Sequence, residues 1–195
     1  FIGNAGTAAR FLSAFLTLGN GEYILDGEPR MRERPIGDLV EALTQLGAKL
    51  QPAATDNCSL VTDYSNICPP IKIIASGLKG GKTKIAGDIS SQFLSALLMT
   101  APYAQSPIEV ELTTDLNSKP YVAMTIAIMK DFGVEVERDD YKSFRVPLTN
   151  YELRNTQSVI RNSYAIEADA SAASYFFAAP AICGGSVQVE NISRK

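Results

Sequence analysis

Apolar residues recur at helical spacing in the first fifty residues of the chain. The first stripe consists of Ala8, Phe11, Leu12, Phe15 and Leu16. Its i, i+3, i+4, i+7, i+8 spacing predicts a helix with one apolar face, ended by the Gly-Asn-Gly sequence at residues 19–21. The second stripe consists of Ile36, Leu39, Val40, Leu43 and Leu46. It predicts a helix ended by Gly47, and short strands are expected after the two helices, at residues 23–25 and 48–50.

The same order of elements is expected again after an irregular segment at residues 51–70. Strands at residues 71–75 and 83–86 are interpreted as a hairpin, joined across the glycines of residues 77–81. The other elements predicted here are a helix from Ser91 with its apolar face at Leu94, Leu97, Leu98 and Ala101, a strand at 108–112, a helix at 121–132, and strands at 134–136 and 144–146.

These two stretches resemble two copies of one unit. The helix-ending glycines Gly47 and Gly133 are 133 − 47 = 86 residues apart, and the helix-opening prolines Pro35 and Pro120 are 120 − 35 = 85 residues apart. A period of this length favours a duplicated subdomain over a solenoid repeat. Because strands alternate with helices, we expect an α/β fold.

A third copy is expected to begin after the polar segment 147–163. A strand at residues 164–167 should lead to Asp169, a good N-cap for a helix over 170–182, and a further strand should precede the last five residues. We therefore expect a linker at 147–163 and a boundary near Glu167, with residues 1–166 as most of one domain and residues 167–195 at the start of another. The chain opens without an initiator Met and ends without a closing element, so we expect a fragment of a longer chain.

The composition narrows the chemistry that is available. The 195 residues include no histidine, which excludes Ser-His-Asp and Cys-His nucleophiles, an imidazole general base and histidine-ligated zinc. The 18 basic and 21 acidic side chains give a net charge of −3. Since nucleic-acid surfaces usually carry an excess of Lys and Arg, we expect anions to bind only at local clusters, with no nucleic-acid partner.

The cysteines and the hydropathy of the chain indicate the cellular compartment of the protein. Cys58, Cys68 and Cys183 are odd in number and no pair has C-x-x-C spacing, so we expect reduced thiols and neither a disulfide framework nor a metal site. No apolar run approaches the ~18 residues that a transmembrane helix needs. A soluble, cytoplasmic protein without a membrane partner is expected.

A glycine-rich turn at residues 3–8 leads directly into the first predicted helix. Glycine lets a ligand approach the backbone closely, and the N–H groups at a helix N-terminus favour an anion such as phosphate or carboxylate. The turn is therefore a candidate anion site. The alternative is an ordinary glycine turn capped by Thr7.

The loop that follows contains Arg30, Arg32 and Arg34 between two prolines. The planar guanidinium group suits bidentate contacts with carboxylate or phosphate, and the prolines stiffen the loop. The alternative is a solvated charged loop in which Glu28 and Glu33 partly neutralise the arginines.

Two further helix starts carry hydroxyl and amide groups. The Ser-Ser-Gln sequence at residues 90–92 has the place in the second copy that the glycine-rich turn has in the first. A serine N-cap explains one of these three residues, and together they could hold a phosphate or sugar-like hydroxyls. Ser118 and Tyr121, at the next helix start, could also donate to a ligand, whereas we interpret Asp169 as an N-cap.

Five motifs resemble, in order, motifs of the 5-enolpyruvylshikimate-3-phosphate synthase (EPSP synthase) family. They lie at residues 3–10 (GNAGTAAR), 29–36 (PRMRERPI), 90–94 (SSQFL), 118–121 (SKPY) and 167–175 (EADASAASY). The resemblance covers essentially the whole chain, and its first two motifs are highly specific. The C-terminal sequence resembles the fungal form, which is part of the pentafunctional AROM polypeptide of the shikimate pathway.

The resemblance implies two domains, each an inside-out α/β barrel of three βαβαββ units, in agreement with the repeat. It also implies an enzyme that transfers the enolpyruvyl group of phosphoenolpyruvate to the 5-hydroxyl of shikimate-3-phosphate and releases phosphate. The reaction passes through a tetrahedral intermediate. No metal or organic cofactor is implied.

The resemblance assigns site residues motif by motif. The residues expected to hold shikimate-3-phosphate are Thr7, Ser90, Ser91, Gln92, Ser118 and Tyr121. Those expected on the phosphoenolpyruvate side are Asn4, Gly6, Arg30 and Gln92. Two polyanionic substrates must be brought together, which calls for arginine and helix N-termini.

The chain departs from the family pattern in two respects. Phe11 stands where some members have a proline. The family's Lys-Ser pair near the N-terminus and the charged residues of its second domain, which include its proton-transfer groups, have no counterparts. Catalytic residues are therefore expected outside the chain, which alone should be inactive. The alternatives are UDP-N-acetylglucosamine enolpyruvyl transferase, whose loop cysteine has no convincing counterpart here, and a non-catalytic anion-binding module.

Overall fold

The computed structural model describes residues 1–53, 63–148 and 164–192. The chain divides into two compact units, Phe1–Ile160 and Arg161–Lys195. Each unit is described by itself.

The first half of the first unit contains two helices and a three-stranded sheet. Its elements are α1 (Gly6–Phe15), the 3-10 turn η1 (Leu16–Leu18), β1 (Asn20–Leu25), the 3-10 turn η2 (Met31–Glu33), α2 (Gly37–Gln45), β2 (Lys49–Pro52) and β3 (Ile71–Ser76). The strand order is β1-β3-β2, and both pairings are antiparallel. The central strand β3 is therefore hydrogen-bonded along both edges.

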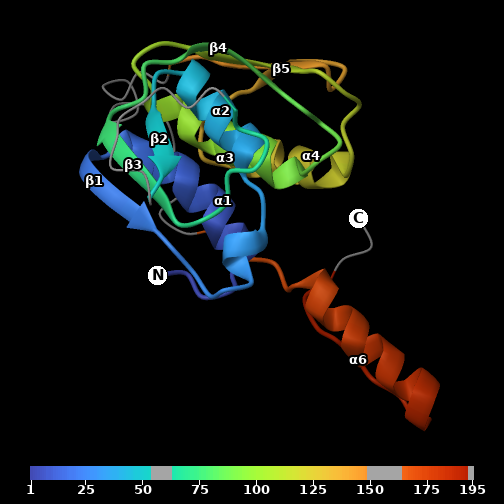
Figure 1. The fold of residues 1–195 in the computed structure, drawn as a ribbon. Coiled ribbons are helices and arrows are strands. Elements are labelled where there is room, and N and C mark those ends of the chain that lie inside the picture. Colours follow the sequence, from blue (N-terminus) through green and yellow to red (C-terminus); the bar gives the residue numbers. More distant parts are fainter. Residues whose placement is uncertain (54–62, 149–163, 193–195) are drawn as a thin grey trace. The chain divides into compact units, whose positions relative to one another are not determined.

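The second half repeats this arrangement and adds one strand. Its elements are β4 (Gly81–Ile85), α3 (Ser91–Thr100), the 3-10 turn η3 (Ala101–Tyr103), β5 (Ile108–Leu112), α4 (Lys119–Asp131), β6 (Glu137–Asp139) and β7 (Ser143–Val146). The strand order is β4-β5-β7-β6, with β4 parallel to β5 and the other pairs antiparallel. Figure 1 shows β1, β2 and β3 on one side of the helices and β4 and β5 along another.

The strand order confirms the predicted duplication. The antiparallel order β5-β7-β6 in the second copy corresponds element by element to β1-β3-β2 in the first. Helices α1 and α3 hold equivalent places in the two copies, and they pack against each other. The N-termini of α1 and α3, which carry the two equivalent motifs, therefore belong to one packed unit.

The apolar stripes correspond to the core more closely for some helices than for others. Every predicted core residue of α2 and α3 is buried. In α1, by contrast, the buried positions are Ala9, Ser13 and Ala14, while Phe15 is 60% exposed. Phe11, Leu12 and Leu16 of the stripe are partly buried and pack against the core, while the most deeply buried face of α1 consists of small residues.

The predicted hairpin between the third and fourth strands is wrong. Strands β3 and β4 belong to different sheets. Because β1 and β2 already occupy both edges of β3, no edge is left for β4. The glycine-rich segment between them instead carries the chain from one sheet to the other. Gly80 N donates to Leu46 O, and Gly81 N donates to Pro107 O.

Three other expected strands also differ from the structure. Residues 134–136 are not a strand, and β6 begins at Glu137 instead. Residues 164–167, and the segment before residue 191, have no strand either. A strand needs a partner for its backbone groups, and no described segment pairs with these residues.

The second unit contains one helix, α6 (Ala170–Cys183), in its described part. As predicted, Asp169 caps it: Asp169 Oδ1 accepts from Ser171 N at 2.8 Å and from Ala172 N at 3.1 Å. The helix ends at Gly184, which has a φ of +73°. None of the helices in the described parts of the chain is long and apolar enough to cross a bilayer.

Candidate functional site

The glycine-rich turn ends at the N-terminus of α1, as predicted. The residue at the cap position is Ala5, and no side chain caps the helix there. The first N–H groups of a helix have no partner within it, so they can bind an anion. The expected alternative, in which Thr7 caps this turn, is therefore wrong.

Gln92 at the start of α3 joins the two copies at equivalent positions. Its Nε2 donates to Thr7 Oγ1 at 3.2 Å, and its Oε1 accepts from Arg10 Nη1 at 2.8 Å. The carboxamide is thus held at both ends, and the N-termini of α1 and α3 become parts of one polar cluster.

Two arginines lie against Gly6, where α1 begins. A β-carbon at Gly6 would stand 2.5 Å from Arg34 Nη1 and 3.2 Å from Arg10 Nη1. Burial, together with the charge of Arg34, lowers the pKa of Arg10. The Nε of Arg10 is buried without a hydrogen-bond partner, and neither arginine has an ion pair among the described residues. Positive charge is therefore concentrated at this helix N-terminus.

The other two arginines of the loop are paired. Arg30 Nη1 lies 2.6 Å from Glu33 Oε2, and both side chains are mostly exposed. Arg32 makes a bidentate contact with Asp26, at 2.9 and 2.7 Å, and this hydrogen bonding lowers the pKa of Asp26. The loop is also tied to the glycine-rich turn, because Glu28 N donates to Gly3 O at 2.9 Å.

The helix starts of the second copy lie close to each other. Ser90 caps α3, since its Oγ accepts from Gln92 N at 3.3 Å. Ser118 precedes α4 with a φ of +58°, in the left-handed region that is uncommon for a residue with a side chain. Ser95 and Thr125 share a hydrogen bond of 2.8 Å that joins α3 to α4.

The predicted site residues are brought together in part. Gly6, Thr7 and Gln92 form one contact cluster with Arg10 and Arg34, which have no ion pair among the described residues. The Ser90 turn and the Ser118 turn are joined through hydrogen bonds of their neighbours. Four predicted residues lie on these turns or the arginine loop and are not part of this contact cluster: Asn4, Ser91, Arg30 and Tyr121. Asn4, Arg30 and Tyr121 are exposed, and Ser91 is half-buried.

Sequence reasoning gave Arg10 no role, and it named Arg34 only as one of three arginines in a candidate anion-binding loop. Arg10 belongs to the first motif and lies four residues after Gly6, so helical spacing places it above the turn. Nothing in the spacing of Arg30, Arg32 and Arg34 distinguishes the arginine that faces α1. That distinction depends on the carboxylates that pair with the first two.

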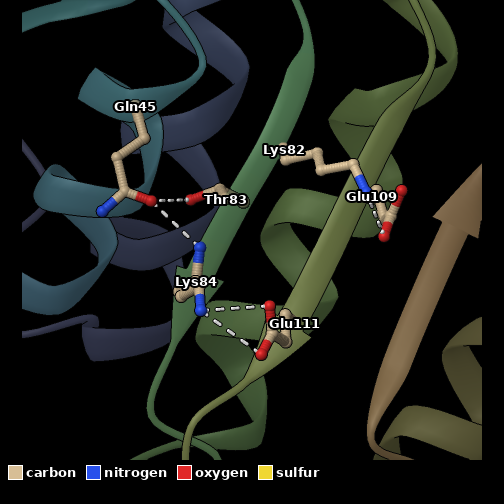
Figure 2. A pocket seen from close by; sticks show the side chains of 6 residues that line it. All are labelled: Gln45, Lys82, Thr83, Lys84, Glu109 and Glu111. Carbon is tan, nitrogen blue, oxygen red and sulfur yellow. Dashed lines mark hydrogen bonds and ion pairs between the residues drawn. The ribbon is translucent and has the colours of Figure 1, made fainter.

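A separate hollow of about 330 Å³ lies where α2 meets β4 and β5. Figure 2 shows Lys82 directed at Glu109 and Lys84 at Glu111, with nitrogen–oxygen distances of 3.0 and 3.2 Å. Gln45 Oε1 accepts from Thr83 Oγ1 at 2.8 Å and from Lys84 N at 2.9 Å. Since these groups satisfy one another, we interpret the hollow as the junction of α2 with the sheet edge.

The cysteines and carboxylates do not form a metal centre in the described residues. No group of three or more potential ligands occurs there. Burial raises the pKa of Cys68, and Cys183 is exposed in the second unit. Cys58 lies outside the described residues.

Comparison with known proteins decides the family. The family model described as EPSP synthase (3-phosphoshikimate 1-carboxyvinyltransferase) matches residues 1–195. The chain belongs to the EPSP synthase family. The fold is accordingly a partial enolpyruvyl transferase fold of the mixed α/β class, as expected.

Relatives of the EPSP synthase family extend this result. The chain is 50% identical to a 3-phosphoshikimate 1-carboxyvinyltransferase of Shewanella sp. (strain ANA-3) over 194 residues, and 48% identical to those of Vibrio campbellii and Sulfurovum sp.. Each match covers 100% of this chain and 42% of the relative. These relatives are bacterial and give the expected fungal multifunctional origin no support.

A solved EPSP synthase of Acinetobacter baumannii shares the fold. The match has a TM-score of 0.59 and 21% sequence identity, and it covers 76% of this chain and 30% of the solved chain. The chain therefore spans less than half of an EPSP synthase in both comparisons.

Proposed function

We propose that this chain supplies part of the substrate-binding site of an EPSP synthase. The enzyme would transfer the enolpyruvyl group of phosphoenolpyruvate to the 5-hydroxyl of shikimate-3-phosphate, giving 5-enolpyruvylshikimate-3-phosphate and phosphate. The observation that carries the proposal is the cluster at the N-terminus of α1, where Arg10 and Arg34 lie against Gly6 and Gln92 joins α1 to α3. Family membership and the identity to the Shewanella enzyme support it.

Each substrate has a proposed side of the site. The helix starts that carry Ser90, Ser91, Ser118 and Tyr121 would bind the phosphate and hydroxyl groups of shikimate-3-phosphate, with Thr7 and Gln92. The turn with Asn4 and Gly6, together with Arg30 and Gln92, would face phosphoenolpyruvate. Hydrogen bonds to anions from backbone N–H groups and arginine are strong in such a setting, and they would hold the two substrates in reacting geometry.

The proposal includes features of the whole protein. The proposal assigns the proton transfers to parts of the enzyme outside this chain, as the family resemblance implies. Phosphoenolpyruvate and shikimate-3-phosphate are the proposed partners, in the cytoplasm and without a cofactor. Fusion to a larger multifunctional polypeptide stays a prediction.

Titration calorimetry and steady-state kinetics of the full-length polypeptide that carries this chain test the proposal. Wild type should bind shikimate-3-phosphate, and Arg30→Ala should keep that binding while it raises KM for phosphoenolpyruvate about ten-fold, because a charge-assisted contact is lost. Arg145→Ala is the matched control, since Arg145 is also an exposed arginine paired with a carboxylate, Glu137. It should change neither value. Absence of shikimate-3-phosphate binding would contradict the proposal, and binding of UDP-N-acetylglucosamine instead would favour the alternative transferase.

A further inference from the structure

The turn before α3 and the turn before α4 are joined by hydrogen bonds centred on Thr114. The N–H groups of Gly87 and Asp88 donate to Thr114 Oγ1 at 2.9 and 3.2 Å. The Thr114 hydroxyl in turn donates to Asp88 Oδ1 at 2.7 Å. A hydroxyl has one donor and two acceptor sites, so the whole hydrogen-bonding capacity of this hydroxyl is used between the two turns.

Asn117 ties the same turns a second time. Its N–H donates to Gly87 O at 3.0 Å, and its Nδ2 donates to Asp88 O at 2.8 Å. Gly87 lets the two backbones touch, because a β-carbon there would stand 2.8 Å from Thr114 O. We call Gly87, Asp88, Thr114 and Asn117 the turn clamp.

The turn clamp adjoins two groups of proposed substrate-binding residues. Ser90 and Ser91 follow Asp88 closely in the chain, and Ser118 follows Asn117 directly. The left-handed backbone of Ser118 is a conformation that persists where the surroundings over-determine it. The two hydrogen bonds of Asn117 supply such a constraint next to Ser118.

The first copy ties its corresponding turns by different groups. Glu28 N donates to Gly3 O, and a β-carbon at Gly27 would collide with the same oxygen. The Asp26–Arg32 pair lies within the second of these two turns and does not join it to the first. A link between the two turns is thus common to both copies, and in the second copy it is built on a threonine hydroxyl and an asparagine amide.

We propose that Thr114 and Asn117 are positioning residues for the shikimate-3-phosphate side of the site. They fix the separation of the Ser90–Ser91 turn from the Ser118 turn, so that one substrate can contact both at once. This inference rests on the proposed function. The phosphoenolpyruvate side depends less on the turn clamp, because Asn4, Gly6 and Arg30 lie in the first copy and the turn clamp lies in the second.

Steady-state phosphate release by the full-length polypeptide tests this inference. Thr114→Val keeps the shape of the side chain and removes its hydroxyl. Asn117→Ala removes the Nδ2 bond to Asp88 O and leaves the backbone N–H bond to Gly87 O in place. We expect each to raise KM for shikimate-3-phosphate about ten-fold, the effect of one or two lost hydrogen bonds. KM for phosphoenolpyruvate should change less than about two-fold, and Thr114→Ser, which restores the hydroxyl, should behave like wild type.

Thr44→Val is the matched control. The Thr44 hydroxyl donates to Val40 O within α2 at 2.8 Å, so its loss should change neither KM. An unchanged KM for shikimate-3-phosphate in both Thr114→Val and Asn117→Ala would overturn the inference, as would equal increases in both KM values. If Thr114→Val does not fold, Asn117→Ala decides alone. Lack of phosphate release by wild type would refute the proposed function itself, and the inference with it.

Discussion

At the first turn of α1, two guanidinium groups share a small space with a residue that has no side chain. Arg10 and Arg34 repel each other, which contributes to the lowered pKa of Arg10. Their proximity is unfavourable for the chain alone and favourable when an anion lies between them or at the helix N-terminus. Gly6 is what leaves room for that arrangement.

We predict that Gly6→Ala separates binding from stability. The β-carbon would displace the Arg34 guanidinium, the far end of a flexible side chain, so the cost to folding is small and alanine's helix propensity offsets it by up to about 1 kcal/mol. The displaced charge should raise KM for phosphoenolpyruvate about ten-fold. Thermal unfolding and steady-state kinetics of the full-length polypeptide check this. A fall in Tm of more than about 5 °C with an unchanged KM would contradict it.

The Asp26–Arg32 pair gives a pH-dependent prediction. The pKa of Asp26 is lowered in the folded protein, chiefly by its hydrogen bond with Arg32, so the pair stabilises the fold above the ordinary aspartate pKa of about 3.9. This contribution is lost as the pH falls through the lower, folded pKa. We expect Asp26→Asn to lower Tm at pH 7 and the difference from wild type to shrink below about pH 4. A difference that stays constant from pH 7 to pH 3 would be inconsistent with this pairing.

Among the elements, α3 holds the first unit together. It packs against α1, α2 and α4, and its central residue Leu97 is fully buried. Its N-terminus carries Ser90, Ser91 and Gln92. The same helix therefore supplies both core packing and proposed binding groups.

We predict that Leu97→Ala destabilises the unit by about 2–5 kcal/mol, because a buried methyl-rich side chain is replaced by a cavity. Met99→Ala is the control on the same helix, since Met99 is 48% exposed, and it should cost less than about 1 kcal/mol. The free energy of unfolding of both variants is measured by urea unfolding of the full-length polypeptide, from the transition that reports this domain. Similar losses for the two variants would show that α3 is not packed as described.

Sequence patterns predicted the positions of helices and strands better than they predicted which elements pack or pair with each other. The stripe of α2 matched the core because Leu39, Val40 and Leu43 all face it. The strands β3 and β4 were predicted correctly, but they do not pair as a hairpin. Whether β3 has a free edge depends on β1, which lies about fifty residues earlier in the chain. In α1 the most deeply buried residues are small, whereas a search for apolar periodicity selects the large side chains.

In the candidate site, too, local features could be predicted from the sequence and contacts between distant segments could not. Helix starts at Gly6, Ser90 and Ser118 were predictable, because glycine, serine and proline end or open helices locally. The location of Arg34 against Gly6, and the turn clamp around Thr114, depend on contacts between segments far apart in the sequence. No local pattern carries that information.

At the scale of the whole molecule, duplication creates the site. Equivalent helix N-termini of the two copies meet through Gln92 and Thr7, which are 85 residues apart. The chain spans 42% of the length of its Shewanella relative. Under the proposed function, further substrate contacts and the proton-transfer groups would lie in other parts of the enzyme.

We therefore predict that the 195-residue chain by itself turns over no substrate. Binding groups without an acid and a base cannot move the protons that enolpyruvyl transfer requires. A purified sample should release no phosphate from phosphoenolpyruvate plus shikimate-3-phosphate above a buffer blank. Release that scales with the concentration of the chain would refute this division of roles.

Phosphate release by the full-length polypeptide tests the central claim most directly. The measurement compares phosphoenolpyruvate alone, shikimate-3-phosphate alone, and both together. An EPSP synthase predicts release only with both substrates, matched mole for mole by 5-enolpyruvylshikimate-3-phosphate. No release with both substrates, or equal release from phosphoenolpyruvate alone, would contradict the account.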